Sequence, residues 1–163
     1  MKKLQSILFR SALAIVTAFA VLAGSVRAAS ADKPSRVIRL IERVQAVSFQ
    51  DADPTGPSLG DRIIFTSNLF DEKGHQVGQD GADCVIVRID LSAPAEEQQI
   101  VQCVITVELF SEGQLTFQSL AQGTENFFAL TGGTGAFRTA RGEAFAKDIT
   151  PLVEAEVTIT LFR

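Results

Sequence analysis

Residues 153–161 read VEAEVTITL, an unbroken alternation of apolar and polar side chains. Successive side chains of a β-strand point to opposite faces, so the apolar set lies on one side and the glutamates and threonines lie on the other. An antiparallel strand with one face in a core and the other toward water has this pattern. The stretch predicts an all-β protein.

Short apolar or alternating segments of the same kind fill the rest of the chain, and turn residues separate them at fairly regular spacing. Eight or nine strands favour a closed antiparallel barrel, whose interior can hold one small ligand. A face of small residues within 136–147 suits tight sheet curvature or an open cavity. We predict strands at 37–49, 62–70, 75–79, 82–91, 98–110, 114–121, 125–130, 136–147 and 152–162.

The first 31 residues have the layout of a secretory signal peptide. Lys2, Lys3 and Arg10 precede an apolar run over 11–23, and small residues at 26–31 offer cleavage sites. A transmembrane anchor is the alternative, but the run is shorter than the roughly 20 residues that a spanning helix needs. We predict a cleaved signal peptide at 1–31, a single domain at 32–163, and a secreted or periplasmic protein with no membrane association after cleavage.

The charge of the expected mature domain limits its partners. Four of the 15 basic residues and none of the 19 acidic residues fall within 1–31, which leaves 11 basic against 19 acidic residues. Binding to nucleic acid or to an anionic membrane surface needs the opposite balance. We therefore expect neither partner.

Cys84 and Cys103 are the two cysteines of the chain. If Ala93-Pro94 forms the turn between two adjacent strands, the cysteines are equally far from it and lie opposite each other, within bonding range. Export favours a disulfide between them, whereas a reducing compartment would leave two free thiols.

Several short motifs occur in order along 37–163. The motifs are SLGD at 58–61, FTSNLF at 65–70, VG at 77–78, GADC at 81–84, GQ at 113–114 and FALTGGTGAFRTARG at 128–142. Together they resemble the family of allene oxide cyclase-like barrels and the related dirigent proteins. The resemblance implies an eight-stranded barrel, often a trimer, that encloses an apolar small molecule and steers its ring closure or radical coupling.

Glu42 is the first candidate catalytic residue. It shares an apolar strand face with Ile38, Leu40 and Val44, where a carboxyl group should have a raised pKa and can transfer protons. It also falls near the glutamate that plant cyclases carry on their first strand. A glutamate that faces solvent, or one that pairs with an arginine, is the alternative.

Ser67 is the second candidate, because it lies between Phe65 and Leu69 on an apolar face. The resemblance aligns it with an asparagine that holds a water in plant cyclases, and a serine keeps donor and acceptor capacity. A structural bond to nearby backbone is the alternative. We assign Phe65, Leu69, Phe117 and Asn68 to the ligand pocket, although Asn68 points to the opposite face of its strand from Ser67.

We expect an isomerase or cyclase that acts on an apolar, oxygenated small molecule. A non-catalytic carrier of the lipocalin kind and a dirigent-like guide of radical coupling are the alternatives. We expect no cofactor and no metal, because His75 is the single histidine and no free cysteine ligands accompany it. A homotrimer would cover outward apolar residues such as Ile100, Val104 and Phe110.

Overall fold

The computed structural model describes residues 33–53 and 56–162. The expected signal peptide lies outside the described residues. No helix within the described ranges has the length and apolar character needed to cross a bilayer.

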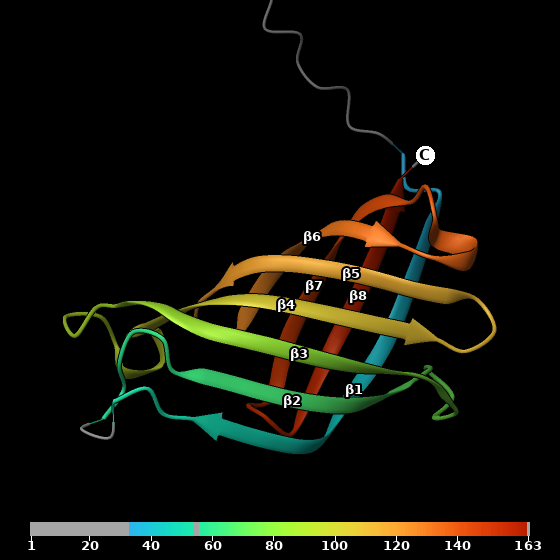
Figure 1. The fold of residues 1–163 in the computed structure, drawn as a ribbon. Helices are drawn as coiled ribbons and strands as arrows, with labels where there is room; N and C mark the ends of the chain where they lie inside the picture. Colours follow the sequence, from blue (N-terminus) through green and yellow to red (C-terminus); the bar gives the residue numbers. More distant parts are fainter. Residues whose placement is uncertain (1–32, 54–55, 163) are drawn as a thin grey trace, which may run out of the picture. The chain divides into compact units, whose positions relative to one another are not determined.

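Eight antiparallel strands, each paired with its neighbours in sequence, form a closed barrel, because β1 also pairs with β8. In Figure 1 the strands β2–β5 pass in front and β6–β8 pass behind them at a steep angle. The strands are β1 (Arg36–Gln50), β2 (Arg62–Phe70), β3 (Gln76–Ile89), β4 (Gln99–Leu109), β5 (Gly113–Ala121), β6 (Glu125–Gly133), β7 (Arg141–Thr150) and β8 (Glu154–Phe162), with short 3₁₀ turns η1 (Ala95–Glu97) and η2 (Gly135–Phe137).

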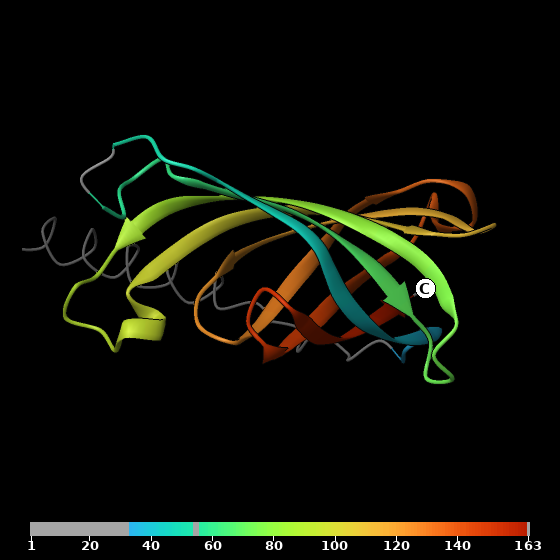
Figure 2. The ribbon, with the colours of Figure 1, turned by 90° about the horizontal axis from the view of Figure 1, so that it is seen from below.

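Strand β1 closes the barrel by bending between two partners. Its first half, from Arg36 to Arg43, pairs with β8, and its second half pairs with β2. The register of the β1–β2 pair shifts between Val44 and Ala46, where a bulge bends the strand. Figure 2, seen from below, shows β1 as one long, bent strand that runs along the barrel.

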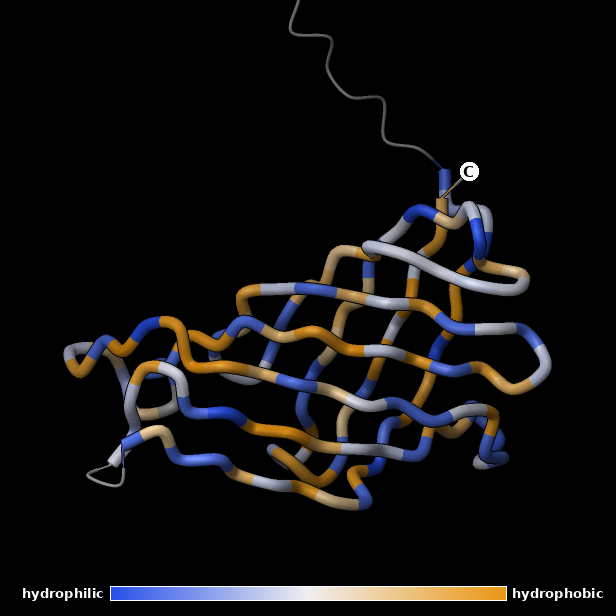
Figure 3. Tube along the Cα trace, in the orientation of Figure 1, coloured by the Kyte–Doolittle hydropathy of each residue, from blue (hydrophilic) through white to orange (hydrophobic). Residues whose placement is uncertain are grey.

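The predicted alternation is confirmed along the strands, where hydrophobic and hydrophilic residues follow each other (Figure 3). On β8 the inward set Ala155, Ile159 and Leu161 is buried. The core is a single cluster inside the barrel that contains Leu40, Leu69, Val107, Leu109, Leu115, Phe117, Phe128, Phe137, Ala144, Ile159 and Leu161.

Two predicted strand boundaries are wrong. The segments 75–79 and 82–91 form one continuous strand, β3, since the Asp80-Gly81 pair bonds into the ladders of both β2 and β4. The segment 136–147 begins with η2 and a turn, and β7 starts only at Arg141. The buried ring of Phe137 belongs to η2, so burial rather than strand pairing explains the apolar character there.

Glycines let the turns at one end of the barrel approach closely. Gly113 has φ +131°, and a Cβ there would lie 2.4 Å from the Thr134 carbonyl oxygen. Gly135 has φ +57°, and its Cβ would lie 2.3 Å from the Glu112 carbonyl oxygen. The β4–β5 turn and the segment before η2 therefore pack backbone against backbone, which a side chain at either position would prevent.

Candidate functional site

Three polar side chains from neighbouring strands meet on the inner face of the barrel. Ser67 of β2 lies opposite Asp80 of β3 in the ladder, and Val44, two residues beyond Glu42, lies opposite Ser67. The Ser67 hydroxyl donates a hydrogen bond to Oε1 of Glu42 across 2.8 Å. The structure thus brings together the two predicted catalytic residues and adds Asp80 to them.

Two adjoining chambers surround this group. The narrow chamber holds about 30 Å³, and Glu42 and Asp80 interrupt its otherwise apolar wall, which includes Leu69, Phe117 and Phe128. The wide chamber holds about 180 Å³ and reaches the end of the barrel where Gly123 and Leu152 lie in turns. The residues that line both chambers are Glu42, Ile105, Phe128 and Ala146.

Glu42 lies where the chambers join, and its carboxyl group is strongly perturbed. Burial, followed by the negative charge of Asp80, raises the pKa of Glu42 to about 7, and the Ser67 hydrogen bond opposes this rise. The charge of Asp148 adds a smaller increase. A carboxyl group with a pKa near 7 can both donate and accept a proton at neutral pH.

Asp80 is a cavity residue that the sequence analysis did not select. Its side chain is only 8% exposed, and burial raises its pKa to about 6, against the opposing effect of Ser67. Within the described part of the chain, no group hydrogen-bonds to its buried Oδ1. Its position on the same face as Ala82 and Cys84 could have revealed it, but the predicted strands 75–79 and 82–91 left it out.

Asp148 is a third carboxyl group of the cavity and was also missed. It follows Ala144 and Ala146 on the inner face of β7 and lines the wide chamber. Partial burial raises the pKa of Asp148. The predicted strand ended at residue 147, one position too early to include it.

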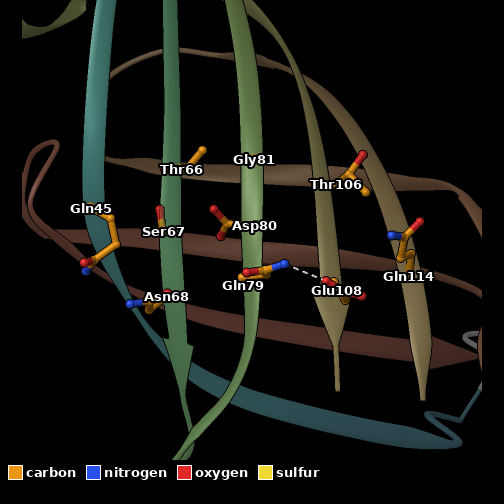
Figure 4. A pocket seen from close by; sticks show the side chains of 10 residues that line it. All are labelled: Gln45, Thr66, Ser67, Asn68, Gln79, Asp80, Gly81, Thr106, Glu108 and Gln114. Carbon is orange, nitrogen blue, oxygen red and sulfur yellow. Dashed lines mark hydrogen bonds between the residues drawn. The ribbon is translucent and has the colours of Figure 1, made fainter. Parts of the chain in front are cut away.

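The predicted pocket residues divide between the two faces of the sheet. Phe65 lines the wide chamber, and Leu69 and Phe117 line the narrow one. Asn68 instead accepts a hydrogen bond from Gln76 across 2.9 Å and lines a separate hollow of about 510 Å³ over β2–β5. Figure 4 shows this hollow, with Asn68, Gln79 and Glu108 in one row across the strands and Ser67 beside Asp80.

Cys84 and Cys103 form a disulfide, as predicted. They are direct partners in the β3–β4 register, with their Cα atoms 4.1 Å apart. Both line the wide chamber, so the bridge forms part of its wall. Its sulfurs serve a structural purpose there, since a disulfide sulfur is no thiolate.

With this barrel and its inner carboxyl groups in view, the family model described as the allene oxide cyclase barrel-like domain matches residues 42–161. The chain belongs to this family. The match begins at Glu42 and includes Ser67, Asp80, Asp148 and the disulfide. Comparison with the curated proteins yields no similar sequence.

Solved structures of this barrel type support the assignment of the fold. A structure described as pyocyanin demethylase is 26% identical, with a TM-score of 0.67, over 77% of this chain and 99% of that chain. The Diels-Alderase AbmU from Streptomyces koyangensis is 16% identical, with a TM-score of 0.65, over 83% of this chain and 71% of that one. The pterocarpan synthase dirigent protein PsPTS1 is 18% identical, with a TM-score of 0.58, over 80% of this chain and 97% of that one.

Proposed function

We propose that this allene oxide cyclase-like barrel binds a small, largely apolar, oxygenated molecule and steers its cyclisation or isomerisation. The observation that carries the proposal is the Ser67–Glu42 hydrogen bond beside Asp80, inside a cavity whose other walls are mostly apolar. Glu42 and Asp80 are therefore the charged groups that a ligand in the narrow chamber would contact.

Glu42 is the proton-transfer group in this proposal. Its pKa of about 7 makes it an effective acid or base at neutral pH, and Ser67 holds one carboxylate oxygen so that the other is free to face the ligand. Asp80 keeps the pKa of Glu42 high through its charge. An isomerisation that shifts a proton needs it removed at one atom and returned at another, and a group of this pKa can perform both steps.

The apolar wall supplies the second contribution. Phe65, Phe117 and Phe128 contact the two chambers and limit the conformations that a bound chain or ring system can adopt. Holding the reacting atoms in contact lowers the entropic part of the barrier. Solved structures of the same fold are described as Diels-Alderases and a dirigent protein. These descriptions are consistent with a cavity whose shape controls how a substrate forms a bond.

The test uses the ligand that the protein itself retains. Native mass spectrometry of protein purified from its own host gives the mass of the bound molecule, which is then extracted and offered to fresh enzyme. We expect the wild type to produce a compound of equal mass and different retention time, and Glu42→Gln, measured at a saturating ligand concentration, to convert the ligand at least about 100-fold more slowly.

The exposed residue Glu143, on the outer face of β7, supplies the matched control. Glu143→Gln removes one charge from the surface and should leave turnover unchanged. Binding without any conversion by the wild type would identify a lipocalin-like carrier. Conversion that occurs only when an oxidising enzyme supplies radicals would identify a dirigent-like guide.

Removal of a methyl group is a second candidate activity, favoured by the 26% identity to the pyocyanin demethylase structure over 99% of that chain. Incubation of the purified protein with pyocyanin, followed by mass spectrometry, tests it directly. In a balanced step, water supplies an oxygen atom, the methyl carbon leaves as formaldehyde, and the ring takes up two electrons and two protons, which air then removes. Formaldehyde together with a net loss of one CH₂ would support demethylation, and recovery of unchanged pyocyanin would contradict it.

The proposed setting of this activity is outside the cytoplasm, after removal of residues 1–31 from the domain at 32–163. The Cys84–Cys103 disulfide supports export, because such bridges persist in oxidising compartments. N-terminal sequencing of the protein from the culture medium or the periplasm tests it. A mature protein that still begins at Met1 would contradict the proposal.

A homotrimer is the proposed assembly. The outer face of the barrel exposes large apolar side chains such as Val104, Phe110 and Leu120, which a second copy would cover. Light scattering at micromolar concentration should give three times the mass of one chain. A monomer at that concentration would contradict the trimer.

A further inference from the structure

Four carboxyl groups line the two adjoining chambers, and three of them have no basic partner among the described residues, whereas the fourth, Glu154, is paired with Arg43. Glu42 of β1, Asp80 of β3 and Asp148 of β7 all line the two adjoining chambers. Among the described residues that line these chambers there is no lysine, arginine or histidine. The negative charges of the cavity therefore have no counter-ion within it.

From this arrangement we infer that the ligand of the cavity is a positively charged ring compound, a flat aromatic cation of one or two fused rings. The inference rests on the proposed function, since it names the class of molecule that the same cavity takes. A buried carboxylate is stabilised by an opposite charge nearby, and here only the ligand can supply that charge.

The unpaired, buried Oδ1 of Asp80 also supports a cationic ligand. Asp80 is 8% exposed, and no described group hydrogen-bonds to its Oδ1. An unpaired buried carboxylate oxygen costs stability, so it is retained where a ligand completes its surroundings. Because Asp80 lines the narrow chamber, a cation bound at the junction with the wide chamber would lie between Glu42 and Asp80.

The size and the walls of the cavity favour a flat ring. A chamber of about 180 Å³ is similar to cavities that hold a single benzene ring, which are roughly 150 Å³. Phe65 and Phe128 line it, and aromatic faces attract organic cations. Apolar walls desolvate the rings while the carboxyl groups neutralise the charge.

The same charges exclude carboxylate ligands. An anion in the cavity would meet Glu42, Asp80 and Asp148 without a basic partner. Arg43, the basic residue next to Glu42 in sequence, faces outward, where Nε lies 3.2 Å from Oε1 of Glu154 and its guanidinium lies over the Phe70 ring. Repulsion between like charges in a desolvated site is costly, so fatty acids and similar anions should bind poorly.

Cation binding should depend on pH through these carboxyl groups alone. Glu42, Asp80 and Asp148 face the cavity from β1, β3 and β7, and Glu154 at the start of β8 lies at its rim, paired with Arg43. The described inward residues of β2, β4, β5 and β6 are neutral. Since the pKa values of Glu42 and Asp80 are raised to about 7 and about 6, both groups gain negative charge between pH 5 and 8.

Three probes of one shape and different charge test the inference: 1-methylquinolinium, 1-methylnaphthalene and 1-naphthoate. The chain has no Trp or Tyr, so the fluorescence of the probes can be read with little protein background. At pH 8 we expect the cation to bind at least about tenfold more tightly than either other probe. This preference should shrink toward pH 5 as the carboxyl groups take up protons.

Two isosteric variants, Asp80→Asn and Glu42→Gln, should each weaken cation binding at pH 8 about tenfold and leave binding of the neutral probe within about twofold. The surface variant Glu143→Gln should change neither. Thermal melts establish that each variant is folded before its affinity is measured.

The outcomes separate this inference from the proposed function. Tighter binding of the neutral or the anionic probe at pH 8 overturns the cationic ligand but leaves a ligand-binding cavity. Binding of none of the three probes overturns both the inference and the cavity as a ligand site. A cation preference that survives equally in both carboxyl variants also overturns the inference.

Discussion

Asp80 lies directly opposite Ser67 in the β2–β3 ladder, and the Ser67 hydroxyl donates its hydrogen bond in the other direction, to Glu42 of β1 across 2.8 Å. Two carboxyl groups thus flank one hydroxyl group on the inner face of three consecutive strands. Hydrogen bonding by Ser67 also lowers the pKa of Asp80, yet Oδ1 of Asp80 has no partner among the described residues.

Replacement of Glu42 by glutamine should stabilise the fold at high pH. The folded-state pKa of Glu42 is about 7, above its ordinary value of 4.5, so protonation favours the folded state. The wild type therefore has this stability in full below about pH 4.5 and loses it as the pH rises through 7. Glutamine does not titrate, so thermal melts should show Glu42→Gln about 2 kcal/mol more stable than wild type at pH 8 and close to it at pH 4.

Glu143→Gln is the control for this comparison, since it removes an exposed carboxyl group. Its melting temperature should equal that of the wild type at both pH values. A Glu42→Gln protein that melts lower than wild type at pH 8 would mean that Glu42 acts as a structural ion-pair partner. The proposed proton-transfer role would then be wrong.

Replacement of Ser67 by alanine should raise the pKa of Glu42 further. The serine hydrogen bond stabilises the ionised carboxylate and so lowers this pKa, against burial and the Asp80 charge. Carbon-detected NMR titration of the Glu42 carboxyl group should show its midpoint move upward in Ser67→Ala. Thr66→Ala, which removes a hydroxyl group from the adjacent, exposed position of β2, should leave the midpoint where it is.

An unchanged midpoint in Ser67→Ala would show that the hydroxyl does not hold Glu42 in solution. A shift of equal size in Thr66→Ala would show that the effect comes from general disturbance of β2.

Removal of the disulfide should destabilise the protein by about 3 kcal/mol, because the bridge closes a loop with a sequence separation of 19 residues and restricts the unfolded chain. Urea unfolding of the Cys84→Ala/Cys103→Ala double variant measures this loss. The reduced wild type should lose a similar amount. Two thiols that react with iodoacetamide in the native, unreduced protein from its own host would contradict the bridge.

Gly113 should not tolerate a side chain, whereas Gly81 should. At Gly113 the positive φ and the 2.4 Å approach of a Cβ to the Thr134 carbonyl oxygen predict a loss of about 2 kcal/mol or more in Gly113→Ala. A Cβ at Gly81 would meet nothing within 4 Å, so Gly81→Ala should change stability by less than about 0.5 kcal/mol. Equal unfolding free energies for the two variants would contradict the close packing of the β4–β5 turn.

Local sequence patterns were sufficient for much of the fold. The alternation in 153–161 predicted β8 and its buried face, and equal distances from one turn predicted the Cys84–Cys103 pair. Glu42 could be selected because one apolar strand face contained one carboxyl group. Each of these inferences depends on side-chain direction within a strand or on the register of one hairpin, which short stretches of chain determine.

The boundaries of β3 and β7 show where such patterns fail. Asp80 and Gly81 are poor strand formers, and the predicted strands 75–79 and 82–91 left them out. In the barrel they have a bonded strand on each side, and the pairing with Ser67 and Val107 outweighs their intrinsic preference. Phe137 and its neighbours appeared as strand residues because they are apolar, yet they form a buried 3₁₀ turn.

The sequence by itself therefore determined an all-β chain and the disulfide partners, and it selected Glu42 and Ser67 as candidates, which the structure joins by a hydrogen bond. Only the tertiary structure decided that Glu42, Asp80 and Asp148 line one cavity, because their strands are brought together by closure of the sheet between β1 and β8. Side-chain direction repeats every two residues and can be read locally. The contact between strands far apart in the chain depends on the stagger of the whole barrel, to which every strand contributes.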